Sequence, residues 1–157
     1  MLQTIDKLKR LGRYEDALQN ALGMLSKKTQ HPQLLYKVAS LYDVLGQEQQ
    51  AIPFYQAAIQ HKLSGQDLQD AYLGLGSTYR ALGRYQESLA TFDAALALFP
   101  EAKDLKMFRA MTLYNLGHCK QAVSQLLIML TEESCAEDIS RYRRAIIHYC
   151  DDLDRIE

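Results

Sequence analysis

The sequence predicts an all-α fold in which helical hairpins repeat about every 34 residues and a further helix closes the chain. Leu-Gly pairs recur at four places, and residues of matching size recur at fixed distances from these glycines. In the last segment, apolar residues recur at steps of three and four, the period of an amphipathic helix. With 157 residues the chain has the length of one domain, so we expect a single domain spanning 1–157.

The four glycines set the register of the repeat. They stand at positions 12, 46, 83 and 117, so the intervals between them are 34, 37 and 34 residues. We place the three extra residues of the middle interval in the loop around Ser64-Gly65-Gln66. Each glycine is expected to take the left-handed conformation that ends the first helix of a hairpin, where a side chain would be costly. The predicted repeats are about 1–30, 31–64, 67–101 and 102–135.

Residues at fixed distances from the glycines predict how the helices pack. Small side chains dominate two aligned positions, seven residues before and five residues after each glycine: Ile5, Ala39, Gly76 and Ala110, then Ala17, Ala51, Ser88 and Ala122. Two further aligned positions, nine and twelve residues after each glycine, include larger side chains: Ala21, Tyr55, Phe92 and Leu126, then Met24, Ala58, Ala95 and Met129. Small residues let two helix backbones approach closely, and larger ones fill the remaining space.

The repeat register predicts nine helices, in four hairpins and a terminal segment. Their expected ranges are 2–11 and 14–27, 32–45 and 48–61, 67–82 and 85–98, 103–116 and 119–132, and finally 138–155. Pro32 and Pro53 each stand near an expected helix start, where proline is tolerated because the first backbone N–H groups of a helix are unpaired.

The residues of the two middle repeats resemble the tetratricopeptide repeat. The third repeat matches its pattern through Tyr72, Leu75, Gly76, Tyr79, Gly83, Tyr85, Phe92, Ala95 and Pro100, and the second through Leu35, Val38, Ala39, Tyr42, Gly46, Ala51, Tyr55 and Ala58. The runs Ser77 to Gly83, Arg141 to Arg144 and Asp151 to Asp154 further resemble a bacterial family of short, free-standing tetratricopeptide proteins. The resemblance implies a right-handed superhelical solenoid of about four repeats with a C-terminal capping helix.

The same resemblance implies a protein–protein interaction module, an adaptor or scaffold without catalytic activity. In such proteins the first helix of each pair lines a concave groove that binds a peptide or helical segment of a partner. The matching positions are Tyr36, Ser40, Asp43, Asp70, Leu73, Ser77, Arg80, Asp104, Met107, Met111 and Tyr114. Their aromatic and methionine side chains favour an apolar or amphipathic ligand. The alternative is that Tyr36, Leu73 and Met107 only pack between repeats.

The C-terminal segment carries one apolar stripe, formed by Ile139, Tyr142, Ile146, Tyr149, Leu153 and Ile156. Charged residues occupy the rest of its surface, as expected of a helix that seals the end of a solenoid. Two alternatives are open. The stripe could instead join two copies in a homodimer, which would make this a structural, self-assembling protein, or it could fold back into the groove.

Composition argues against several other functions. A formal net charge of −1 provides no general attraction to nucleic acid or anionic membranes. The first repeat is nevertheless basic, through Lys7, Lys9, Arg10, Arg13, Lys27 and Lys28. This basic side is either a solvated surface or a contact for an acidic partner or RNA. No stretch has the length of a membrane span or the pattern of a signal peptide, so we expect a cytoplasmic protein.

The sequence predicts no catalytic residue, no metal site and no cofactor. The histidines are dispersed without metal-ligand spacing, and no Cys-x-x-Cys occurs. Gly74-Leu75-Gly76 is not expected to bind phosphate, because it lies within a helix and follows no strand. Cys119 takes the place of Tyr14 and Tyr85 in other repeats, so we expect it to be a packed apolar residue.

Overall fold

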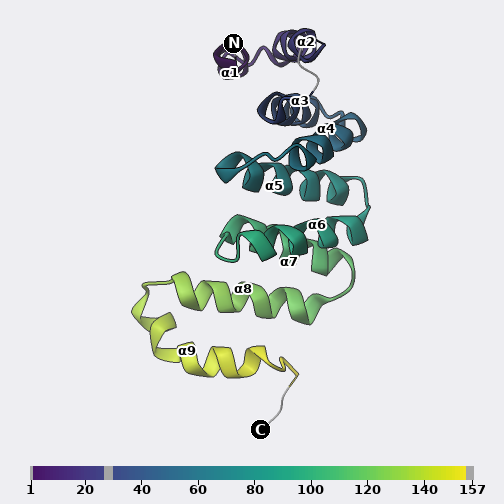
Figure 1. The fold of residues 1–157 in the computed structure, drawn as a ribbon. Helices are drawn as coiled ribbons and strands as arrows, with labels where there is room; N and C mark the ends of the chain where they lie inside the picture. The colour runs from purple at the N-terminus through teal and green to yellow at the C-terminus, as the bar shows by residue number, and fades with distance from the viewer. Residues whose placement is uncertain (1, 27–29, 155–157) are drawn as a thin grey trace. The chain divides into compact units, whose positions relative to one another are not determined.

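The computed structural model describes residues 2–26 and 30–154, and within these ranges it contains helices and no strands (Figure 1). The helices are α1 (Leu2–Arg10), α2 (Tyr14–Leu25), α3 (Pro32–Val44), α4 (Glu48–Gln60), α5 (Gly65–Ala81), α6 (Tyr85–Leu98), α7 (Lys103–Asn115), α8 (Cys119–Glu133) and α9 (Glu137–Cys150). The predicted all-α repeat is confirmed. The last helix ends at Cys150, before the predicted residue 155, and residue 27 of the second predicted helix lies outside the described residues.

A glycine in the left-handed conformation ends the first helix of each hairpin, as predicted. At Gly46 φ is +68°, its N–H donates to the carbonyl oxygen of Asp43, and the next N–H donates to that of Tyr42, both at 2.9 Å. Gly12, Gly83 and Gly117 have the same sign of φ and the same pair of hydrogen bonds. These bonds pair carbonyl groups that the end of a helix would leave without a partner.

The three-residue insertion lies between α4 and α5, where a lysine takes the place of glycine. Lys62 has φ of +63°, and its N–H and that of Leu63 close the end of α4 with the same hydrogen-bond pattern. Gly65 also has a positive φ and begins α5, two residues before the predicted start. The insertion therefore lengthens α5 at its start.

The expectation for Pro53 was wrong. Pro32 opens α3, but Pro53 lies in the second turn of α4, which begins at Glu48. A proline there has no N–H to donate to the carbonyl group four residues earlier. Its own side chain is exposed, while Ile52 and Tyr55 on either side of it are buried, so tertiary packing holds the helix through this position.

The chain divides into two compact units, and the first is Met1–Thr91. One of its cores lies under α1 to α3 and includes Ile5, Ala17, Ala21 and Val38. The other lies under α3 to α5 and is formed by Leu35, Ala39, Ala51, Ile52, Tyr55, Ala58, Leu63, Ala71, Leu75 and Tyr79. The aligned small residues are buried here, which confirms the predicted close packing of neighbouring helices.

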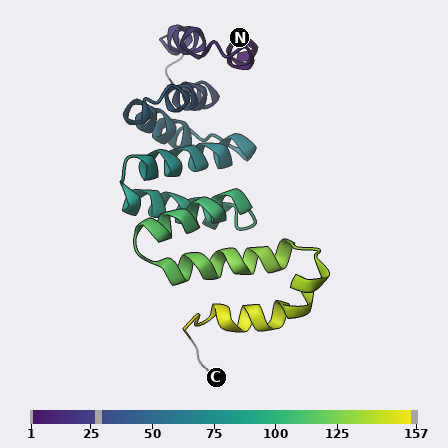
Figure 2. The same ribbon diagram turned by 180° about the vertical axis from the view of Figure 1, so that it is seen from behind.

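The second unit, Phe92–Glu157, contains the end of α6 with α7, α8 and α9. Its buried side chains include Phe92, Ala95, Leu105 and Leu113, and the rings of Phe92 and Phe108 lie 6.4 Å apart. In both views α8 runs beside α7 and is followed by α9, with which it is in contact (Figure 2). None of the helices in the described parts of the chain is long and apolar enough to cross a membrane.

Candidate functional site

In the first unit, the predicted binding residues lie on α3 and α5 among polar contacts that join the first helices of successive repeats. Lys37 of α3 forms an ion pair with Asp6 of α1. Beside it, Lys9 Nζ donates a hydrogen bond to Ser40 Oγ at 2.9 Å. Burial, with the nearby Lys37 ammonium, lowers the pKa of Lys9. Ser40, predicted to meet a partner, is therefore occupied by a contact within the chain.

Asp43 is the centre of a hydrogen-bond network that joins three helices. Its carboxylate accepts a hydrogen bond from Tyr55 Oη at 2.7 Å and from Thr78 Oγ1 at 2.8 Å. Burial raises the pKa of Asp43, and the two hydrogen bonds oppose that shift. Burial and the Asp43 carboxylate also raise the pKa of Tyr55. The network connects α3, α4 and α5, so Asp43 has a structural role whether or not it also meets a ligand.

Gly74 makes room for the Tyr55 ring of this network. A Cβ at position 74 would lie 2.5 Å from Cζ of Tyr55, which is too close for any unstrained contact. Sequence reasoning explained Gly76 by close packing and found no role for Gly74. The sequence carried one signal of this role: a glycine in the middle of a helix is unfavourable by about 1 kcal/mol relative to alanine, so its presence indicates a need for close packing.

Tyr36, Asp70 and Leu73 lie at the same end of the α3–α5 pair. The Tyr36 ring is 6.3 Å from that of Tyr55, and Asp70 accepts a hydrogen bond from Gln66 Nε2 at 2.7 Å. Burial, with the Asp70 and Asp67 carboxylates, raises the pKa of Tyr36 to about 12. Leu73, Ser77 and Arg80 continue along α5 and are half-buried.

In the second unit, the predicted residues of α7 are more exposed. Met107, Met111 and Tyr114, spaced by four and three residues, all project from the helix into solvent, and Met107 is 49% exposed. Asp104 is half-buried and accepts a hydrogen bond from the N–H of Leu105 at 2.8 Å. Apolar side chains on this helix are therefore open to a ligand, in contrast to the polar contacts of α3.

Arg109 on another side of α7 joins this helix to its neighbours through hydrogen bonds. Arg109 Nε donates to Asp93 Oδ1 at 2.6 Å, and its Nη1 donates to Gln125 Oε1 at 2.8 Å. Gln125 Nε2 also donates to the carbonyl oxygen of Lys106. These groups border a pocket of about 440 Å³ whose apolar lining is Leu96, Ile128 and Met129. Arg109 and Gln125 thus form a polar bridge between α7 and α8 beside this pocket.

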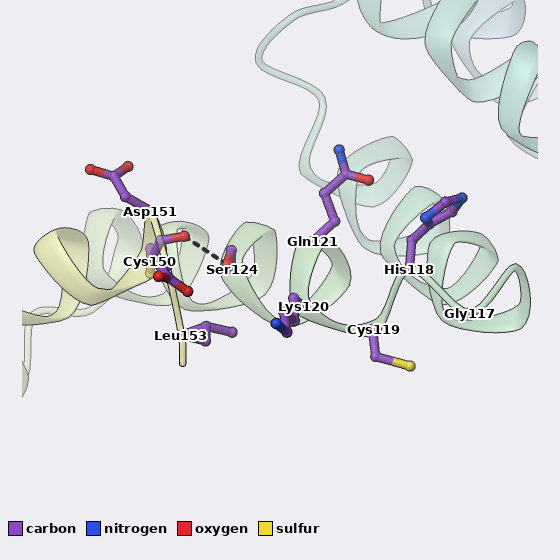
Figure 3. A pocket seen from close by; sticks show the side chains of 10 residues that line it. Gly117, His118, Cys119, Lys120, Gln121, Ser124, Cys150, Asp151 and Leu153 are labelled. Atoms are coloured by element: carbon purple, nitrogen blue, oxygen red, sulfur yellow. Dashed lines mark hydrogen bonds between the residues drawn. The ribbon is translucent and has the colours of Figure 1, made fainter. Parts of the chain in front are cut away.

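A second pocket, of about 570 Å³, lies where α8 begins and α9 ends (Figure 3). Ser124 Oγ donates to the carbonyl oxygen of Cys150 at 2.9 Å across it. Burial, with the Asp151 carboxylate, raises the pKa of Cys150, so this thiol is a poor nucleophile. The Cys119 side chain points away from Cys150. We find no arrangement in this pocket that would perform acid–base or nucleophilic chemistry.

Two details of the sequence interpretation change. Cys119, the first residue of α8, is exposed rather than packed. The apolar stripe of α9 is not uniformly buried: Cys150 is buried against Ser124 of α8 and Ile146 is half-buried, whereas Tyr142 and Tyr149 are exposed. Ile156 lies outside the described residues. Among the residues that the structure describes, no group of three or more His, Cys, Asp or Glu is placed to hold a metal ion.

Comparisons with known proteins agree with this architecture. A family model described as tetratrico peptide repeat matches residues 32–153. The structure is similar to that of YrrB, a TPR protein with an unusual peptide-binding site, with a TM-score of 0.71, 18% identity, and coverage of 96% of this chain and 76% of that one. It is also similar to MamA, with a TM-score of 0.68, 14% identity and coverage of 95% of each chain.

Two curated relatives are much longer proteins. The chain is 28% identical over 116 residues to the human protein O-mannosyl-transferase TMTC1, a match that covers 74% of this chain and 13% of that protein. It is 27% identical over 92 residues to superkiller protein 3 of Saccharomyces cerevisiae, covering 59% of this chain and 6% of that protein. The match to the transferase is thus partial, and proteins of this repeat type are typically not catalytic. The family model spans most of the chain, which therefore belongs to the tetratricopeptide repeat family.

Proposed function

We propose that the chain is an adaptor or scaffold, and that the first helices of its repeats bind a peptide or helical segment of a partner protein. The observation that carries the proposal is the exposed series Met107, Met111 and Tyr114 on α7. Methionine adapts its shape to different apolar ligands, and a tyrosine ring supplies a large contact area. An amphipathic segment with apolar anchors matches these side chains better than a charged one. The cytoplasm is its proposed location.

The predicted binding positions present different side chains in the two units, each considered by itself. On α3, Ser40 and Asp43 are held by hydrogen bonds within the chain, so they present an ordered polar surface. On α7 the exposed apolar side chains are available to be buried by a ligand. Apolar burial supplies most of the free energy of binding, and fixed polar groups supply orientation. We therefore place the anchoring contacts of the proposed site on α7, within the second unit.

Selection from a displayed library of random peptides, followed by calorimetric titration of the selected peptides, tests this function. Wild type should select peptides with apolar residues, and Met107→Ala/Met111→Ala should weaken their binding by about 10-fold or more. Leu98→Ala is the matched control, since Leu98 is 56% exposed but lies on α6, outside the proposed site. Equal affinity of the double variant and the control would contradict the assignment, and failure to select any peptide would contradict the function.

A second candidate function is self-association, and one observation favours it. The exposed apolar side chains of the second unit extend beyond α7, to Val123, Leu126 and Leu130 of α8 and to Tyr142 and Tyr149 of α9. A large exposed apolar patch on a small protein commonly marks an interaction site. A homodimer through the C-terminal helix is the alternative that the sequence predicts, and Tyr142 and Tyr149 of α9 are exposed apolar side chains.

A further inference from the structure

The polar contacts between α1 and α3 join two ammonium groups to a single carboxylate. Lys37 of α3 pairs with Asp6 of α1, and the Lys37 side chain is only 19% exposed. Lys9, three residues after Asp6, is half-buried and donates to Ser40 Oγ, which is a neutral acceptor. Within the described part of the chain, Lys9 has no ion pair of its own, because the Asp6 carboxylate is taken by Lys37.

Positive charge is therefore in excess at this cluster of Lys9, Lys37 and Asp6. Burial lowers the pKa of Lys9, the neighbouring Lys37 ammonium lowers it further, and the Asp6 carboxylate opposes the shift. Two ammonium groups against one carboxylate leave a net charge of +1. A partly buried charge without a counter-ion is costly, and an anion that binds beside it reduces that cost. The cluster is thus complementary to one negative charge.

Both ammonium groups keep hydrogen-bond donors for such an anion. An ammonium group has three N–H donors. Lys9 directs one of them to Ser40 Oγ, and Lys37 directs one to Asp6. The Ser40 hydroxyl in turn donates to the carbonyl oxygen of Lys37 at 3.2 Å, so its oxygen is oriented to accept from Lys9. The remaining donors, held on two successive first helices, suit a carboxylate, whose two oxygens can accept from both.

We propose that the ammonium groups of Lys9 and Lys37 form a binding site for a carboxylate of the partner segment. The inference rests on the proposed function, and it adds that the bound segment is acidic at one position. The site lies within the first unit, and its argument does not depend on the apolar side chains of α7. An acidic side chain and a free C-terminus present the same carboxylate chemistry, and the experiment below separates them.

The charge of the cluster favours a carboxylate over RNA, the other ligand that the basic first repeat suggested. One carboxylate neutralises an excess of one positive charge, whereas RNA binding relies on many phosphate contacts and on aromatic rings that stack with bases. Elsewhere in this repeat Arg13 pairs with Asp16, which cancels its charge. Lys27 and Lys28 lie outside the described residues.

A matched pair of lysine substitutions tests the site on peptides selected from a displayed library with wild type. The selected peptides should contain Asp or Glu, and each is titrated in that form and with the acid replaced by Asn or Gln, all with amidated C-termini. For wild type the replacement should weaken binding by about 10-fold, as expected for hydrogen bonds to a charged group. For Lys9→Gln the same replacement should have little effect. Lys7→Gln is the control and should keep the full preference, since Lys7 is an exposed lysine of the same helix.

The outcomes separate the site from the function. Failure to select any peptide overturns the proposed function and the site with it. Selected peptides that bind equally as acid and amide, or that show the same preference with Lys9→Gln as with Lys7→Gln, overturn only the carboxylate site. A preference that appears only when the C-terminal amide is replaced by a free acid would support the site and assign it to a chain end. Competition by single-stranded RNA that is lost in Lys9→Gln would assign the cluster to phosphate and overturn the proposal.

Discussion

Helices α4 and α8 occupy the same place in their repeats and differ in what surrounds them. The buried side of α4 is covered by α5. Its Tyr55 donates a hydrogen bond to Asp43, and its ring fits against the backbone of α5 because position 74 is a glycine. The corresponding side of α8 is exposed, and α8 is joined to its neighbours by Arg109, Gln125 and Ser124. A repeat pattern specifies which side chains are apolar, but the placement of the next helix determines whether they are buried.

Truncating equivalent residues should give the largest contrast. Phe92→Ala removes a side chain with no exposure and should lower the free energy of unfolding by about 3–5 kcal/mol. Leu126→Ala removes an exposed side chain and should change the monomer by about 1 kcal/mol or less. Urea denaturation at a concentration where the protein is monomeric measures both. Similar losses for the two variants would mean that this side of α8 is covered in solution.

Adding a single methyl group should distinguish the crowded side of α5 from open helix surface. Gly74→Ala places a carbon against the Tyr55 ring and should destabilise the protein by about 1–3 kcal/mol. Gly23→Ala in α2 is the control, because a Cβ there meets nothing within 4 Å and should stabilise the helix by about 0.5–1 kcal/mol. Thermal unfolding of the two variants should shift in opposite directions. A stabilised Gly74→Ala would show that Tyr55 does not approach this backbone.

The Asp43 network should make the stability of the first unit depend on pH. Burial raises the folded-state pKa of Asp43 above its ordinary value of 3.8, so the folded protein holds this proton more tightly than the unfolded chain. Between these two pKa values the contribution of Asp43 to stability falls as pH rises. The difference in unfolding free energy between wild type and Asp43→Asn should therefore favour wild type more at the acidic end of that window. A difference that does not change with pH would contradict the assigned burial.

The smallest expected effect concerns the loop that lengthens the middle repeat. Lys62 adopts a left-handed conformation in the place where the hairpin turns use glycine. Lys62→Gly removes the steric penalty of the side chain and should raise the unfolding free energy by a few tenths to about 1 kcal/mol. Differential scanning calorimetry can detect the accompanying rise in melting temperature. Lys62→Ala, which retains a Cβ, should show no such rise.

The repeat register was predictable because it depends on local physics. A glycine that ends a helix, and small residues on one side of it, act within a few turns of the chain, so the four hairpins could be placed from the sequence. The role of Gly74 could not, since it depends on Tyr55 of another helix. The same holds for Asp43, which sequence reasoning assigned to a ligand and which the structure joins to Tyr55 and Thr78. The predicted binding residues as a set stay a prediction.

The sequence by itself determined the helices, their glycine turns and the positions of their apolar and small residues. The tertiary structure decided which of those apolar residues are covered: Tyr55 and Phe92 are buried, while Leu126 and Tyr142 are not. The physical reason is that periodicity records only the side of a helix on which apolar residues lie. Burial requires a second surface, and its position depends on side-chain contacts such as Arg109 with Gln125 and Ser124 with Cys150, which are distant in sequence.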